Sequence, residues 1–161
     1  MRGRLLVIAI GCAAFVGFAT AQQQQQLQPL NVKTGLWLIT KAVTWTNLPP
    51  QMAYMMRAPQ QMTYNSCVTA QNLTSNPWAE GSGDRCVWTV LNSTGTDMEV
   101  QATGCSLGNG MTAQVHGHIH ILDSQDGTGS MTLAVNAGSG QTFNGQATYT
   151  GKWVNSTCPA H

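Results

Sequence analysis

Charge is what this chain has least of. Charged side chains make up 8% of its 161 residues, against about a quarter in typical soluble domains. Seven basic and six acidic residues leave a formal net charge of +1, so the sequence has no basic patch large enough to bind nucleic acid. It also lacks a phosphate-cradling loop and any C-x-x-C pair, which argues against nucleotide binding and against a thiolate metal site. Apolar residues, at 42%, suffice for one packed domain.

Long apolar runs are also scarce, and the one that occurs lies at the N-terminus. Arg2 and Arg4 precede an apolar run over residues 5–18, and small residues follow at 19–21. The run is shorter than the roughly 20 residues that span a membrane, and the pattern is typical of a secretory signal peptide over residues 1–21. We therefore expect an exported protein with no transmembrane segment after signal removal. A polar, Gln-rich lead over residues 22–30 and a single domain over residues 31–161 would follow.

Cysteine usage agrees with export. Of the five cysteines, Cys12 lies in the predicted signal peptide. The other four indicate two disulfides, because thiols oxidise outside the cytoplasm. Four cysteines allow three pairings. The simplest joins sequence neighbours, Cys67–Cys86 and Cys105–Cys158, with stabilisations of about 3 and 4 kcal/mol from loop closure.

Alternation of apolar and polar residues dominates the rest of the chain, and this period of two is typical of half-buried strands. It predicts strands over residues 35–46, 86–92, 97–104, 111–121, 130–136 and 141–154. Short clusters rich in Gly, Asn, Ser and Asp separate most of these strands at regular spacing. The pattern predicts an all-β fold, a single antiparallel meander of six to eight strands that forms a curved sheet or a partly closed barrel.

Two segments depart from the alternation. Prolines begin and end the segment near residues 49–58, which predicts one short helix there. Residues 72–84 read as a long loop, and this loop carries Trp78, the one tryptophan placed outside a strand.

Methionines gather around the predicted helix. Met52, Met55 and Met56 have the i, i+3, i+4 spacing of an amphipathic turn, and Met62 follows. Thioethers bind Cu(I), and a flexible Met-lined surface can hold an apolar ligand. The helical spacing favours packing against the sheet.

Several short segments carry a family resemblance. They are Gly35-Leu36-Trp37, Cys67-Val68-Thr69, the strand from Cys86 to Val90, Cys105, and Gly151-Lys152-Trp153 followed by Cys158. Together they resemble the bacterial exported family known as domain-of-unknown-function family 3617, over essentially the whole chain after the signal peptide. The resemblance implies bacterial export and a four-cysteine, β-rich fold. It carries over no activity, because the family has none assigned.

The sharpest local motif is His-Gly-His-Ile-His at residues 116–120. On a strand its imidazoles point to the same side, with neighbours roughly 6.6–6.8 Å apart. A hairpin with the preceding strand would set Glu99 opposite His116 and Asp97 opposite His118. His116, His118 and Glu99 are therefore candidate ligands for Zn²⁺ or Cu²⁺. The favoured alternative is a solvated face of cross-strand carboxylate–imidazole pairs.

Catalytic groups are few. The six carboxylates are scattered, bridged cysteines offer no free thiol, and the Gly-Ser-Gly loops lack a nucleophile elbow. We predict a non-catalytic binding or interaction module of the bacterial cell envelope, periplasmic or extracellular. Its partner would be an apolar small ligand or an envelope protein. The alternatives are a periplasmic metal-binding protein, with Zn or Cu as cofactor, and a surface component that self-associates through its strand edges.

Overall fold

The computed structural model describes residues 27–54, 59–79, 85–108, 110–138 and 140–159. The predicted signal peptide, and the predicted lead up to residue 26, lie outside these residues. Within them the chain forms seven strands, one short helix and one 3-10 turn. The strands are β1 (Gly35–Thr46), β2 (Gln60–Val68), β3 (Arg85–Ser93), β4 (Asp97–Gly108), β5 (Met111–Ile121), β6 (Asp126–Asn136) and β7 (Thr142–Asn155). The helical segments are α1 (Pro50–Ala53) and η1 (Asn72–Thr74).

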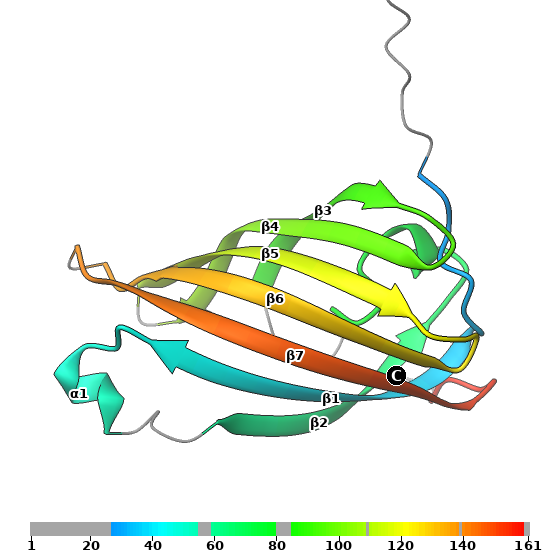
Figure 1. Cartoon of the computed structure of the whole chain (residues 1–161), viewed down its shortest axis with the longest axis horizontal. Helices are drawn as coiled ribbons and strands as arrows, with labels where there is room; N and C mark the ends of the chain where they lie inside the picture. The colour runs from blue at the N-terminus through cyan, green and yellow to red at the C-terminus, as the bar shows by residue number, and fades with distance from the viewer. Residues whose placement is uncertain (1–26, 55–58, 80–84, 109, 139, 160–161) are drawn as a thin grey trace, which may run out of the picture.

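All seven strands belong to one antiparallel sheet in the order β2-β1-β7-β6-β5-β4-β3 (Figure 1). Strands β3 to β7 form a meander, β1 pairs with β7, and β2 pairs with β1. The sheet is curved but not closed, and β2 and β3 form its two edges. Because seven strands alternate in direction, these two edges run parallel to each other. The predicted all-β fold of six to eight antiparallel strands is confirmed, and of its two forms, a curved sheet or a partly closed barrel, the structure has the curved sheet.

Two strands have the bounds that the alternation predicted, β1 and β5. Strand β2 was not predicted, because its first four residues are all exposed and a buried face begins only near its end, at Ser66 and Val68. Of the predicted helix near 49–58, Pro50–Ala53 is helical, and residues 55–58 lie outside the described part of the chain. No helix among the described residues is long and apolar enough to cross a membrane.

The core lies on the inner face of the sheet. Alternate residues of every strand point inward, and the largest fully buried side chains include Trp37, Ile39, Met98, Ile119 and Phe143. Leu30 is buried in the same core, and the next residue, Asn31, donates its backbone N–H to Gly95 O at 2.8 Å. The packed domain therefore begins within the predicted Gln-rich lead rather than after it.

The loop after β2 sends one large side chain into this core. Trp78 is 3% exposed, and its indole lies over glycines of β6 and β7. A Cβ built on Gly151 would lie 2.8 Å from Trp78 Cζ2, and one on Gly127 would lie 3.0 Å from the same ring. Gly127 and Gly151 are cross-strand partners, so no side chain separates the indole from the sheet backbone at this point. The loop tryptophan is thus a core residue.

The predicted disulfide pairing is wrong. The bonds join Cys67 to Cys158 and Cys86 to Cys105, with Cα–Cα distances of 5.6 and 4.1 Å. Cys67 does not pair with Cys86 because β2 and β3 are at opposite edges of the sheet. Cys67 lies instead beside the segment that follows β7 and carries Cys158. Cys86 and Cys105 lie on the adjacent strands β3 and β4. Each bridge therefore holds one edge strand.

Candidate binding surface on the outer face of the sheet

The outer face of the sheet carries rows of uncharged polar side chains. Strict alternation along β5, β6 and β7 sends even-numbered residues outward, and the register aligns them across strands. One row runs His116–Thr132–Gln146, and the next runs His118–Ser130–Thr148. Since the face of each residue follows from its parity, the alternation that builds the core also builds this surface.

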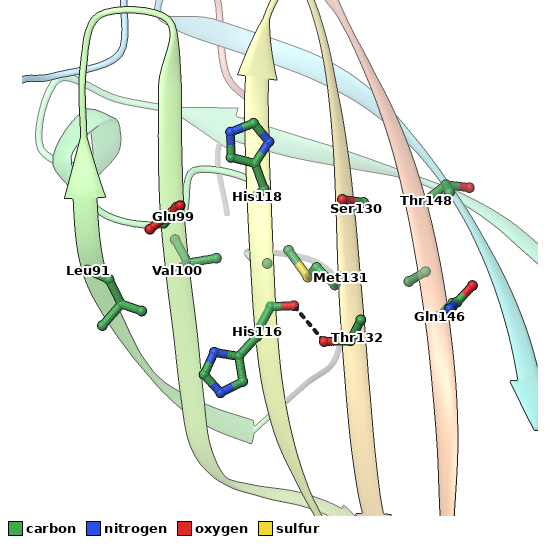
Figure 2. A pocket seen from close by; sticks show the side chains of 12 residues that line it. Leu91, Glu99, Val100, His116, His118, Ser130, Met131, Thr132, Gln146 and Thr148 are labelled. Atoms are coloured by element: carbon green, nitrogen blue, oxygen red, sulfur yellow. Dashed lines mark hydrogen bonds between the residues drawn. The ribbon is translucent and has the colours of Figure 1, made fainter.

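These rows line an open hollow of about 420 Å³, which we call the outer hollow (Figure 2). Its outward side chains are Glu99, His116, His118, Ser130, Thr132, Gln146 and Thr148, with Leu91 at one side. A second hollow of about 280 Å³ shares His116, Thr132 and Gln146 with it and extends towards Gln114 and Asn144. Together they form a continuous polar depression across β5, β6 and β7.

The outer hollow combines polar and apolar groups. Hydroxyl, amide and imidazole groups line it together with Leu91, Val100, Met131 and Ala147, and Glu99 is the one carboxylate in its lining. Thr132 Oγ1 donates to His116 O at 3.5 Å, a long bond that leaves the hydroxyl oxygen open as an acceptor. The surface thus offers donors and acceptors in close succession without a cationic group.

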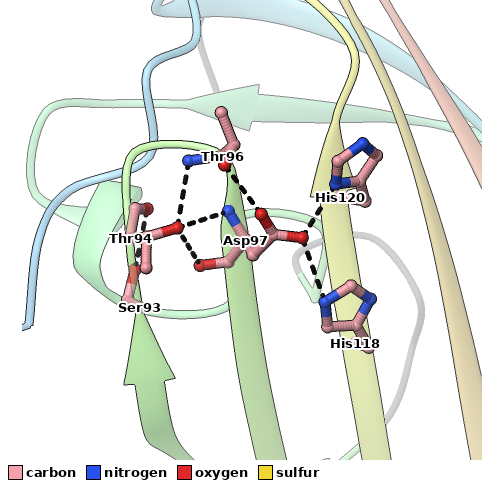
Figure 3. Close-up of polar contacts among 6 residues, drawn as sticks. All are labelled: Ser93, Thr94, Thr96, Asp97, His118 and His120. Carbon is pink, nitrogen blue, oxygen red and sulfur yellow. Dashed lines mark hydrogen bonds and ion pairs between the residues drawn. The ribbon is translucent and has the colours of Figure 1, made fainter.

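An acidic residue organises the two histidines at one end of this surface (Figure 3). Asp97 Oδ1 lies 2.8 Å from His120 Nδ1 and 3.2 Å from His118 Nε2. Thr96 Oγ1 donates to Asp97 Oδ2 at 2.7 Å. The bond from Thr96, followed by the bond from His120, holds the pKa of the Asp97 carboxyl below its usual value. The two imidazoles stack with ring centroids 6.4 Å apart.

The predicted register of this hairpin is two residues out. Glu99 lies opposite His118, and Asp97 lies opposite His120, whereas the sequence set them opposite His116 and His118. Strand β4 continues to Gly108, four residues beyond its predicted end, and two irregularities in the β4–β5 ladder shift the pairing. A shift of two residues keeps every side chain on its face, so the polar face is as predicted while the partners differ.

The predicted metal ligands come to one place without forming a ligand set. Glu99, His116 and His118 all line the outer hollow. Among the described residues, however, no three His, Cys, Asp or Glu side chains are grouped so that they could hold a metal ion. His118 already directs Nε2 at Asp97. A Zn or Cu site at these residues stays a prediction, and it would require side-chain rearrangement.

The same surface brings a serine beside a histidine and an aspartate. Ser130 is the register partner of His118, whose Nε2 contacts Asp97. The Nε2 atom that would accept a proton from the serine thus faces the carboxylate. A nucleophile–base pair needs the serine hydroxyl within hydrogen-bonding reach of the imidazole. No such bond to Ser130 occurs among the described residues, so the row does not assemble a catalytic triad.

The interior offers little room for a ligand. The space enclosed between Lys41, Trp88, Tyr149 and the Cys86–Cys105 bridge measures about 20 Å³, enough for one water. Lys41 is 8% exposed, and its Nζ lies 5.5 Å from the centroid of the Tyr149 ring. The alternation of β1 placed Lys41 on the inner face with Trp37 and Ile39, and this signal was available in the sequence.

The predicted methionine surface is only partly represented. Met52, in α1, is half-buried and packs against the buried core residues, which agrees with the packing interpretation. Met62 on β2 is exposed. Met55 and Met56 lie outside the described residues, so the arrangement of the cluster as a whole stays a prediction.

Comparisons with known proteins identify the chain through its family alone. No curated protein and no solved structure matches it. A family of proteins of unknown function, DUF3617, matches residues 32–158, which include all seven strands and all four bridged cysteines. The chain is a member of the DUF3617 family.

Proposed function

We propose that this protein is a non-catalytic binding module of the bacterial cell envelope, exported to the periplasm or beyond, and that it binds neutral oligosaccharides in the outer hollow. The observation that carries the proposal is a hollow of about 420 Å³ whose lining combines uncharged hydrogen-bonding side chains with apolar ones. This volume falls within the range of about 300–1,000 Å³ typical of ligand sites.

The lining selects the class of ligand. Sugar hydroxyls both donate and accept hydrogen bonds, and the side chains of Thr132, Gln146 and Thr148 do the same. Glu99 and the nearby Asp97 disfavour an anionic ligand. Leu91, Val100, Met131 and Ala147 add apolar surface on which the apolar face of a sugar ring can pack, beside polar side chains that can bind its hydroxyls. The interior space next to Lys41 and Tyr149, at about 20 Å³, is too small for an apolar ligand.

Export and the lack of catalysis rest on separate observations. Two disulfides agree with a non-reducing environment, and the N-terminal 21 residues have the pattern of a signal peptide. The four described cysteines are all bridged, which leaves no free thiol among them. The row of Ser130 and His118 lacks the hydrogen bond that would activate a hydroxyl.

Calorimetry with defined trisaccharides tests the proposal. The purified protein is titrated with maltotriose, cellotriose and triacetylchitotriose, and with trigalacturonic acid as the anionic comparison. We expect at least one neutral sugar to bind and the acid to bind more weakly. Failure of all three neutral sugars at millimolar concentration, or a preference for the acid, would overturn the proposal.

Variants locate the site. Thr148→Val and Gln146→Leu remove hydrogen-bonding groups from the hollow with little change in shape. Each should weaken binding about 3- to 10-fold, the value of one net hydrogen bond. Thr150→Val is the matched control, because Thr150 is exposed on β7 and does not line the hollow. An equal loss in Thr150→Val, or no loss in the other two, would place the ligand elsewhere.

A further inference from the structure

The edge strand β3 has the features of a strand that accepts another strand. It lies at one end of the sheet order, with β4 as its neighbour on one side and no strand on the other among the described residues. From Cys86 to Ser93 its sequence contains no charged residue, no proline and no glycine. Natural sheets commonly protect exposed edges with charges, prolines or bulges. The β3–β4 ladder has an irregularity before Val87 and another between Val90 and Asn92, and it is regular from Val87 to Val90, so this central stretch lacks those protections.

The outer face of β3 is also unusually apolar. Val87 is 69% exposed and Leu91 is 49% exposed, on either side of the exposed Thr89. The other edge differs, because the outward residues of β2 are polar and the loop after β2 covers its end. There Asn72 Nδ2 donates to Cys67 O at 3.1 Å. On β3 the described cover is limited to the far end, where Gln28 N donates to Ser93 O at 3.1 Å.

The order of side chains along β3 is symmetric about Thr89. Val87 and Leu91 lie two residues to either side on the outer face, and Trp88 and Val90 lie one residue to either side on the inner face. In an antiparallel pair of β3 strands centred at Thr89, Val87 of each copy therefore lies opposite Leu91 of the other copy. It sets no charged residue opposite another charge, since Arg85 falls opposite Ser93. Such self-complementarity is what a two-fold interface requires.

We propose that β3 is a self-association edge, through which two copies of this chain pair antiparallel about a two-fold axis at Thr89. The partner proposed is a second copy, because the antiparallel register of β3 with itself that is centred at Thr89 sets both Val87 and Leu91 against an apolar residue. Each copy covers the exposed Val87 and Leu91 of the other and provides backbone hydrogen bonds along the edge. The two outer hollows then lie on one continuous face. This last consequence rests on the proposed function, whereas the pairing does not.

Sedimentation velocity over a wide concentration range tests the pairing. The protein should show a monomer–dimer equilibrium, and Thr89→Lys should abolish the dimer because it places two ammonium groups opposite each other at the axis. Thr63→Lys is the matched control, a threonine exposed on the other edge strand, and should leave the dimer unchanged. A strict monomer at millimolar concentration, or a dimer lost in Thr63→Lys and kept in Thr89→Lys, would overturn the proposal.

Cross-linking tests the register independently. In the proposed dimer the two Thr89 residues are direct partners, with Cβ atoms about 4.5–5.5 Å apart, so Thr89→Cys should form a disulfide-linked dimer on oxidation. Two Val87 residues would be four positions apart along the ladder, about 13–14 Å, so Val87→Cys should not. Peptide mapping of the native bridges verifies that each variant is correctly folded. Efficient linkage through Val87→Cys, or none through Thr89→Cys, would refute this register.

Discussion

The packing of Trp78 against Gly127 and Gly151 allows a quantitative prediction about the stability of the fold. A Cβ at position 151 would lie 2.8 Å from Trp78 Cζ2, closer than such contacts allow, and 3.1 Å from Ile39 Cδ1. Gly151→Ala should therefore destabilise the fold by about 1–3 kcal/mol through overpacking. Trp78→Ala should cost about 3–5 kcal/mol, because it removes a large side chain that is 3% exposed.

The double variant separates this contact from general damage. If the alanine methyl clashes with the indole, its cost should largely disappear when Trp78 is already alanine. Urea unfolding of the four proteins gives the coupling energy, which we expect to be about 1–2 kcal/mol. Trp78→Phe provides a second, milder background, because it removes ring atoms that approach Gly151 while keeping an aromatic core residue.

Gly95 provides a matched control for the added methyl group. Gly95→Ala adds the same methyl where the nearest heavy atom, Asn31 Cβ, is 3.9 Å away, and it should change stability by less than about 0.5 kcal/mol. If Gly151→Ala costs the same with and without Trp78, the indole does not rest on that glycine. The account of the loop as part of the core would then be wrong.

Three further predictions concern the bridges, the carboxylate and the histidines. Replacing Cys67 and Cys158 by serine should lower the free energy of unfolding by about 4–5 kcal/mol, and replacing Cys86 and Cys105 by about 3 kcal/mol, because the first bond closes the longer loop. Urea unfolding checks this order. A peptide from the non-reduced protein that links Cys67 to Cys86 would contradict the pairing. The lowered pKa of Asp97 stabilises the fold above the unfolded value near 3.8, and this stability is lost as the pH falls through the folded value. Asp97→Asn should thus lower stability at pH 7, with unfolding curves of variant and parent converging in acid; a cost independent of pH would exclude the linkage. Removing His116 and His118 together should leave the heat of Zn²⁺ or Cu²⁺ titration unchanged, since no ligand group is assembled there, and a clear drop in affinity would establish the metal site.

The sequence predicted the strands well because alternation is a local signal. The bounds of β1 and β5 follow directly from residues that alternate between core and solvent. Strand β2 was not predicted, because its first four residues are all exposed and only its last part alternates between core and solvent. The burial of Trp78 was not predicted, because it depends on contacts with glycines about 50 or more residues later in the chain.

Long-range partners were the part that sequence reasoning could not supply. The disulfide pairing depends on the order of strands in the sheet, and that order places β2 and β3 at opposite edges. The histidine partners depend on two ladder irregularities near Cys105 and Gly108, which no periodicity reports. The polar face itself was predictable, because a register shift of two residues preserves the face of each side chain.

The most direct test of the account is an amide chemical-shift titration of the isotope-labelled protein with the neutral trisaccharides. The account predicts that the shifts concentrate on the outer-face residues His116, Thr132, Gln146 and Thr148, while inward residues such as Ile119 and Tyr149 change little. Shifts confined to the interior or to the loops, or none with any neutral trisaccharide at millimolar concentration, would contradict it.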